Sequence, residues 1–220
     1  MGEIARSRET DARVAAARGL EVVVSRGAVD ELLRLLDDET AVVEHAAMDA
    51  LVAMEKAPLK VGVRGALEKR LALTGQPNSS RARAARCLSR IAHPDSLGAL
   101  AARLDDRSED VRAACAEAVG HLKDGAPAVG PKLVDMLDDP DIEVRRQVIF
   151  ALGRLRFREA APPLIELLES EDQGMQSTAL WALRAISGYP FPNSADRWKE
   201  WWKHESARVE SSPSEDGDDR

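Results

Sequence analysis

The sequence predicts an all-α fold: a right-handed α-α superhelix of about five antiparallel helix pairs that follow an N-terminal half repeat. Two observations lead to this prediction. One apolar pattern recurs through the 220 residues, and aromatic residues make up only 4%, which suits helix pairs packed through Leu, Val and Ala. The pattern places equivalent residues at intervals of 31, 37, 31, 33 and 31, on Leu20, Leu51, Leu88, Val119, Leu152 and Leu183. This period suits two helices and two turns and is typical of stacked-repeat solenoids.

The first helix of each pair carries a short apolar stripe. In the unit at 126–156 the stripe is Leu133, Val134 and Leu137, and Pro131 is predicted in the first turn, where its missing N–H costs nothing. The interval of 37 indicates an insertion of turn-forming residues at 75–80. The first helices are predicted at 29–36, 60–73, 96–104, 129–137 and 161–169.

The second helices begin after a turn that contains Asp. In the same unit Pro140 disfavours helix for the residue before it, and Asp141 is a good N-cap. Gly153 allows the neighbouring helix to approach closely. The second helices are predicted at 11–24, 41–54, 80–92, 109–122, 142–155 and 174–187. Residues 1–9 are too short for a full first helix, so the N-terminus is either a half-repeat cap or continues a start that lies upstream.

The C-terminal part differs from the repeats, and the chain divides into a solenoid at 1–188, a capping helix at 189–204 and a disordered acidic tail at 205–220. Trp198, Trp201 and Trp202 share one face of the predicted capping helix. The tail holds six acids and two arginines, and its polar composition cannot support a core.

The repeats resemble the HEAT-repeat family, specifically the short bacterial HEAT-like repeats also seen in phycobilisome lyase subunits. The resemblance covers about residues 11–188 and is carried by the Asp-Asp turns at 37–38, 105–106 and 138–139, the Val-Arg pairs at 111–112 and 144–145, and the Ala-Leu-Gly-Arg-Leu run at 151–155. It implies a structural ladder between neighbouring repeats, formed by Asp106, Arg112, Asp139 and Arg145. Glu44 and Gln176 stand at the Arg position and weaken the ladder at both ends.

The end of the chain resembles the Gly-x-x-Phe…Trp-x-x-Trp-Trp ending of bacterial HEAT-like arrays, with Gly188 and Phe191 before the three tryptophans. This resemblance implies that Trp198, Trp201 and Trp202 cover the open apolar edge of the last repeat. The alternative is a Trp-rich groove for a partner.

No constellation for chemistry is found, and we expect a non-enzymatic protein with no catalytic, cofactor or metal site. The paired acids recur in several units as a turn device would, and the four His lack metal-ligand spacing. Cys87 and Cys115 stand at inward positions as small apolar groups. Without a signal peptide or an 18-residue apolar run, we expect a cytoplasmic monomer with no membrane contact.

In HEAT-like arrays the second helices line the concave side, where their third, seventh and eleventh residues should face outward. Phe150 and Trp181 fall in this row with arginines beside them, a composition typical of binding hot spots. The alternative is that these two aromatics bury against each other as an extension of the core. The predicted partner-binding residues are Arg86, Arg90, Glu117, His121, Arg146, Phe150, Arg154 and Trp181.

The leading functional hypothesis is a HEAT-repeat scaffold or adaptor that binds a protein partner on this concave face. One alternative implied by the resemblance is a lyase subunit that attaches a bilin to a phycobiliprotein. Another is DNA binding or repair, as in HEAT-like alkylpurine DNA glycosylases, through a basic stripe on one helix. The net charge of −7 opposes nucleic-acid binding. The stripe consists of Arg81, Arg83, Arg86 and Arg90.

Overall fold

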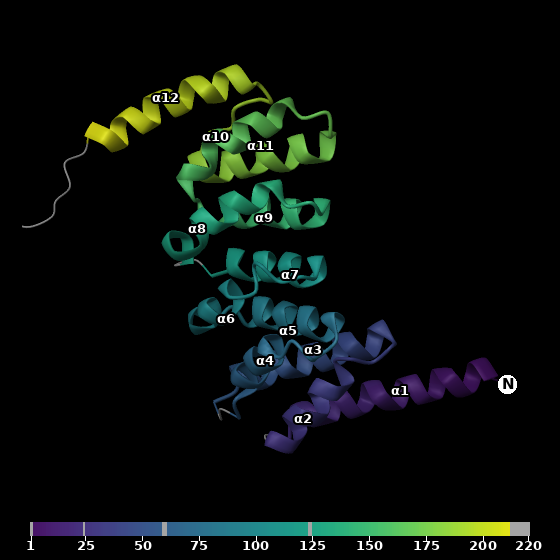
Figure 1. The fold of residues 1–220 in the computed structure, drawn as a ribbon. Coiled ribbons are helices and arrows are strands. Elements are labelled where there is room, and N and C mark those ends of the chain that lie inside the picture. The colour runs from purple at the N-terminus through teal and green to yellow at the C-terminus, as the bar shows by residue number, and fades with distance from the viewer. Residues whose placement is uncertain (1, 24, 59–60, 123–124, 212–220) are drawn as a thin grey trace, which may run out of the picture.

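The computed structural model describes residues 2–23, 25–58, 61–122 and 125–211, and this part of the chain is a stack of helix pairs. Helix α1 (Gly2–Glu21) precedes five antiparallel pairs, and α12 (Ala195–Ser211) follows them. Figure 1 shows the pairs stacked one on another, with α1 at one end of the stack and α12 at the other. The predicted all-α superhelix of five pairs and a half repeat is therefore confirmed.

The first helices of the pairs are short. They are α2 (Arg26–Leu35), α4 (Val63–Ala72), α6 (Leu97–Ala101), α8 (Ala126–Asp135) and α10 (Ala161–Glu166). Tighter 3-10 turns extend three of them, before α6 at Pro94–Ser96, after α8 at Met136–Asp138, and on both sides of α10 at Arg158–Ala160 and Leu167–Glu169. Such turns are common at helix ends because they satisfy backbone groups that the helix leaves open.

The second helices are longer and form a continuous layer. They are α3 (Ala41–Lys56), α5 (Asn78–Ile91), α7 (Glu109–Gly120), α9 (Ile142–Leu155) and α11 (Gln173–Ser187). The predicted N-cap is present: Asp141 Oδ1 accepts from the backbone N–H groups of Glu143 and Val144, at 2.9 and 3.0 Å.

The core lies between the two helix layers and continues from one pair to the next. Five of the six equivalent positions of the apolar pattern are fully buried, and Leu20 in α1 is partly buried. A Cβ on Gly120 would lie 2.8 Å from Ala151 Cα, and one on Gly153 would lie 3.0 Å from Ala182 Cα. These glycines let α7, α9 and α11 pack almost backbone to backbone, as predicted for Gly153.

One junction in the stack is looser than the others. Helix α3 packs less closely on α5 than the later second helices pack on each other, and α2 and α4 scarcely touch. This is the junction at which the interval between repeats is 37 residues. The predicted insertion at 75–80 is wrong, because the turn before α5 is as long as the turn before α3 and α5 already begins at Asn78. The extra residues instead extend α3 to Lys56 and lengthen the segment between α3 and α4. The stacking of the first and second pairs therefore departs from the regular repeat.

Several predicted boundaries differ from the structure, three of them with consequences for the description of the chain. Helix α1 begins at Gly2 rather than at residue 11, because the N-terminal residues continue the helix instead of forming a separate partner. Helix α8 begins at Ala126, so Pro131 lies inside the helix and Pro127 takes the first-turn position. Helix α12 continues to Ser211, which makes the predicted start of the tail at residue 205 wrong; residues 212–220 lie outside the described part.

Candidate functional site

Arginines on the second helices pair with aspartates in the next turn and form a ladder through the stack. Arg112 binds Asp139 in two places, Nε to Oδ2 at 2.7 Å and Nη2 to Oδ1 at 2.9 Å. Asp139 Oδ1 also accepts from the backbone N–H of Asp141 at 2.9 Å. The carboxylate therefore orders the turn and joins two repeats at the same time.

The electrostatics of Asp139 follow from these contacts. Burial acts to raise the pKa of this carboxyl, but the hydrogen bonds from Arg112 and from the backbone of Asp141 outweigh it, so the pKa lies below its usual range. The same bidentate contact raises the pKa of Arg112. The pair is thus ionised over the physiological range.

Two ladder pairs were missed in the sequence. Arg13 in α1 pairs with Asp38 at 2.8 Å, and Arg81, which is 4% exposed, pairs with Asp106. A signal for both was present, because Arg13 and Arg81 occupy the same repeat position as Arg112.

Arg145, Glu44 and Gln176 complete this row. The expectation that Arg145 joins two repeats is wrong, since its guanidinium donates to backbone carbonyls of its own turn, Asp139 O at 2.6 Å and Pro140 O at 3.3 Å. Glu44 in α3 forms an ion pair with Arg83 in α5 at 3.0 Å. At this junction the acid therefore lies on the earlier helix and the arginine on the later one, the reverse of the other ladder pairs. Gln176 forms a neutral hydrogen bond of 3.3 Å with Asn193.

The predicted partner face is open along much of the second-helix layer, and its two large aromatics touch. Phe150 and Trp181 meet edge to face with ring centroids 5.2 Å apart, and the Arg154 guanidinium carbon lies 6.0 Å from the Phe150 centroid. Phe150 is half-buried, whereas Trp181 is 41% exposed. Both interpretations therefore hold in part: the rings pack on each other and still present an apolar surface.

The other predicted partner residues have mixed surroundings. Arg86 is exposed and Glu117 is half-buried. Arg90 pairs with Asp49 on α3, the preceding second helix, at 2.6 Å, and Arg146 pairs with Glu143 at 2.8 Å.

His121 lies at the end of α7, where its Nδ1 is 2.7 Å from Ser89 Oγ. The expectation that third positions face outward is wrong at Ala82 and Ala113, which neighbouring helices bury.

The predicted basic stripe on α5 is not a continuous cationic surface. Arg81 is buried against Asp106, Arg83 pairs with Glu44, and Arg90 pairs with Asp49. Three of its four arginines therefore have carboxylate partners, which leaves little charge for phosphates.

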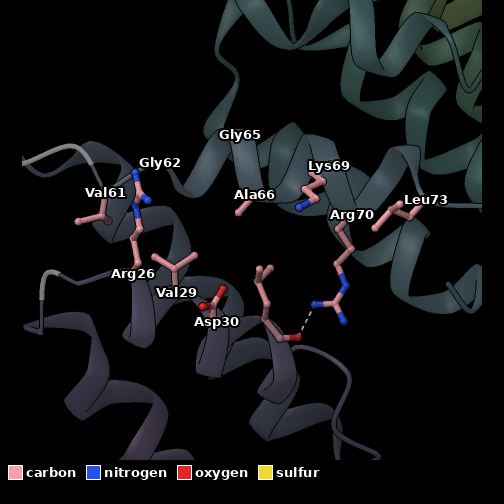
Figure 2. Close-up of a pocket in the computed structure, with 11 residues that line it drawn as sticks. Arg26, Val29, Asp30, Val61, Gly62, Gly65, Ala66, Lys69, Arg70 and Leu73 are labelled. Atoms are coloured by element: carbon pink, nitrogen blue, oxygen red, sulfur yellow. Dashed lines mark hydrogen bonds between the residues drawn. The ribbon is translucent and has the colours of Figure 1, made fainter.

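A groove that the sequence did not indicate lies at the looser junction, between α2 and α4. Its volume is about 470 Å³, and Val29 from α2 and Ala66 from α4 line it from opposite sides (Figure 2). Arg70 bridges the two helices by donating to Leu33 O. Gly65 leaves space on α4, since a Cβ there would meet nothing within 4 Å.

The described residues hold no group of three or more His, Cys, Asp or Glu that could bind a metal ion. Burial raises the pKa of Cys87 and Cys115 to about 12, so both thiols stay protonated and behave as apolar groups. Within the same residues, no helix is long and apolar enough to cross a membrane.

The tryptophans of α12 close the last repeat. Trp198 is fully buried against α10 and its Nε1 donates to Pro192 O at 3.1 Å, while Trp201 is 8% exposed. Trp202 is half-buried and packs against the same core. The structure therefore places these side chains as a cap rather than as an open groove.

Stacked helix pairs, a buried Arg–Asp ladder and an open second-helix surface define an α-solenoid repeat protein. The family profile of HEAT repeats matches residues 66–141 and 130–212, which together span more than half of the chain. The chain therefore belongs to the HEAT-repeat family. No curated protein matches it significantly in sequence.

Solved structures show the same fold. The complex of CpcE and CpcF of phycocyanin lyase from Nostoc sp. PCC7120 matches with a TM-score of 0.57 and 21% identity, over 79% of this chain and 68% of that chain. A designed armadillo repeat protein in complex with the peptide (KR)4 matches with a TM-score of 0.55 and 21% identity, over 82% and 92% of the two chains. At this identity the likeness shows the fold alone.

Proposed function

We propose that this protein is a non-enzymatic scaffold or adaptor, a cytoplasmic monomer that binds a protein partner on the face formed by the second helices. The observation that carries the proposal is the Phe150–Trp181 pair, whose exposed part has Arg154 beside it. Aromatic residues and arginine are enriched at the centres of protein interfaces, because they bury a large area with few rotatable bonds.

The packing of the layers supports this choice of face. Successive second helices pack closely on each other from α5 to α11, whereas the first helices touch each other sparsely. In a curved stack the layer with the closer packing lies on the inside, which supports a concave position for the aromatic pair. A concave surface offers a partner segment contacts from several repeats at once.

The test compares capture of a partner from a lysate of the source organism by the wild-type protein and by a Phe150→Ala/Trp181→Ala double variant. We expect the double variant to lose at least about tenfold in affinity, since truncation of hot-spot aromatics typically has an effect of this size. A matched control is Tyr189→Ala, which removes an aromatic that is 48% exposed and lies outside this face.

Circular dichroism provides the folding control, because Trp181 also covers Gly153 on the neighbouring helix. A partner that binds the folded double variant as tightly as the wild type would move the binding site elsewhere on the protein. A double variant that unfolds would show that the aromatic pair belongs to the core.

The lyase alternative has one supporting observation, the shared fold with the CpcE and CpcF complex. Co-expression with a phycobiliprotein and a bilin, followed by absorbance, separates it from binding alone. DNA binding has less support, since most arginines of the α5 stripe already pair with carboxylates. Absence of salt-sensitive gel retardation at low ionic strength would exclude it.

A further inference from the structure

Each junction between units brings together two defined positions. One is the repeat position that Arg112 occupies in α7, here called the ladder position. The other is the residue two places before the N-cap of the next second helix. In chain order these pairs are Arg13 with Asp38, Glu44 with Gly75, Arg81 with Asp106, Arg112 with Asp139, and Arg145 with Ser170.

Only one of these junctions has a cation without its anion. Where Gly75 replaces the aspartate, Glu44 has also replaced the arginine. At the last junction the arginine is kept, but Ser170 stands where an aspartate is expected, and its Oγ accepts from the N–H of Asp172 as the aspartates accept in their own turns. Arg145 is therefore the unmatched member of the ladder.

The guanidinium of Arg145 donates to the backbone of its turn in the same way as the guanidinium of Arg112. Arg112 Nη1 donates to the carbonyls of Asp106 and Arg107 at 2.9 and 3.3 Å, and Arg145 Nη1 donates to the equivalent carbonyls of Asp139 and Pro140 at 2.6 and 3.3 Å. In Arg112 the remaining edge binds the Asp139 carboxylate. Among the described residues, nothing forms a hydrogen bond or an ion pair with that edge of Arg145.

A cavity of about 310 Å³ lies beside this arginine, with Ser170 in its lining and Leu167 and Met175 as apolar wall. Serine is shorter than aspartate by one carbon and one oxygen, so the site of the missing carboxylate group is part of this space. An arginine with a fixed planar donor edge and an open cavity is suited to a carboxylate, which can accept two parallel hydrogen bonds.

Two acids also line the cavity, Asp138 and Asp172. The equivalent positions next to the ion pair of Arg112 and Asp139 also carry acids, Asp105 and Asp141. Two acids at these positions are therefore compatible with a carboxylate bound to the arginine. Asp105 is paired with Lys132, whereas Asp138 has no such partner among the described residues. Repulsion by Asp138 reduces the affinity of the cavity for a carboxylate, but solvent screens this repulsion because the Asp138 side chain is exposed.

We propose that the cavity beside Arg145 is a binding slot for a carboxylate supplied by another molecule, either a small carboxylic acid or an acidic side chain of a protein. The bound carboxylate takes the place next to Arg145 that Asp139 holds next to Arg112. This site lies at the turn between two repeats and is independent of the aromatic pair on the second-helix face.

The test is thermal unfolding in sodium acetate against sodium chloride at equal ionic strength. We expect acetate to raise the midpoint of the wild type by about 1–2 °C more than chloride does, since a ligand near its dissociation constant stabilises by this amount. Ser170→Asp supplies the carboxylate within the chain, so it should raise the midpoint by about 2–4 °C and abolish the acetate response. Arg145→Gln should abolish the response as well, whereas Arg146→Gln, a neighbouring arginine on the same helix, should keep it.

The source of the carboxylate is distinguished by a pair of blocked tripeptides, acetyl-Gly-Glu-Gly-amide and its Gln counterpart. A response to acetate and to the Glu peptide but not to the Gln peptide supports a slot open to protein side chains. A response to acetate alone supports a slot for small acids. Equal acetate shifts in the wild type, Arg145→Gln and Ser170→Asp would overturn the proposal, and so would a Ser170→Asp variant without added stability.

Discussion

At three junctions an aspartate stands two places before the N-cap of a second helix, and its carboxylate has two functions. In Asp139, Oδ1 accepts from the N–H of Asp141 and also from Arg112, whose Nε binds the second oxygen. Asp106 likewise accepts from the N–H of Ser108 and pairs with Arg81. A glutamate has the same charge but is one methylene longer, and therefore cannot keep both contacts in the same geometry.

Loss of one ladder pair is expected to destabilise the protein markedly. A double-mutant cycle of Arg112→Gln and Asp139→Asn should give a coupling energy of about 1–3 kcal/mol, because the pair is bidentate and largely shielded from solvent. The cycle is measured by urea unfolding. The exposed pair of Arg146 and Glu143 serves as the control and should contribute at most about 0.5 kcal/mol. Equal coupling energies for the two pairs would contradict a special role for the ladder.

His121 is expected to make stability depend on pH near neutrality. Burial lowers its pKa, and the charge of Arg154 lowers it further, while Glu117 acts in the opposite direction. The folded state therefore binds this proton less readily than the unfolded chain, so the stability that His121 contributes is present above a pH of about 6.5 and decreases as the pH falls below it.

The free energies of unfolding of the wild type and His121→Gln, compared from about pH 7.5 down to about pH 5, check this expectation. The advantage of the wild type should shrink as the pH falls. An NMR titration that places the pKa of His121 above the value of about 6.5 for a free histidine would contradict it.

At the scale of the helices, small residues determine how closely the second helices approach. Gly120 faces Ala151 and Gly153 faces Ala182 across two successive junctions, and Trp181 lies over Gly153. The aromatic pair of the proposed binding face therefore depends on the glycine beneath it. At the looser junction between α3 and α5 the repeat is longer, and a groove opens between α2 and α4 (Figure 2).

The same substitution should have opposite effects at two glycines. Gly120→Ala places a Cβ 2.8 Å from Ala151 Cα, where only backbone movement can relieve the overlap, and should cost about 1–3 kcal/mol. Gly65→Ala in α4 meets nothing within 4 Å and should stabilise by about 0.5–1 kcal/mol through helix propensity. Both values are read from chemical denaturation. A stabilising Gly120→Ala would show that α7 and α9 are less closely packed than described.

At the scale of the whole molecule, contacts between neighbouring helix pairs hold the stack together, and a different helix covers each of its two ends. Helix α12 covers the C-terminal end with Trp198 and with ion pairs from Lys199 to Glu169 and from Arg158 to Glu205. Helix α1 covers the other end and contributes Arg13 to the ladder (Figure 1). In such arrays stability is close to a sum over units and their interfaces, so damage at one end stays local at first.

Removal of the main cap residue tests this locality. Trp198→Ala should cost about 3–5 kcal/mol, as is usual for a buried aromatic. Hydrogen exchange should show the loss of protection first in α10, on which α12 packs, and in α11, which packs on α10, and last in α2 and α3. Trp202→Ala, which truncates a half-buried neighbour, is the control and should have a smaller effect. A uniform loss of protection along the chain would show that the stack unfolds as one unit.

The sequence by itself determined the number of repeats, the order of their helices, the cap at Asp141 and the Trp cap, because apolar periodicity and capping residues act within a few positions of the chain. Only the tertiary structure decided which charges meet across repeats. It paired Arg13 with Asp38, because such a contact depends on how one pair is rotated and shifted on the next. Once this pairing is known, the sequence itself leaves Arg145 unmatched, since Ser170 stands at the position of the aspartate. The repeat pattern placed Phe150 and Trp181 in one row and left open whether they bury against each other. Only the structure decided that the rings meet while Trp181 stays 41% exposed, because this depends on how closely α9 and α11 pack.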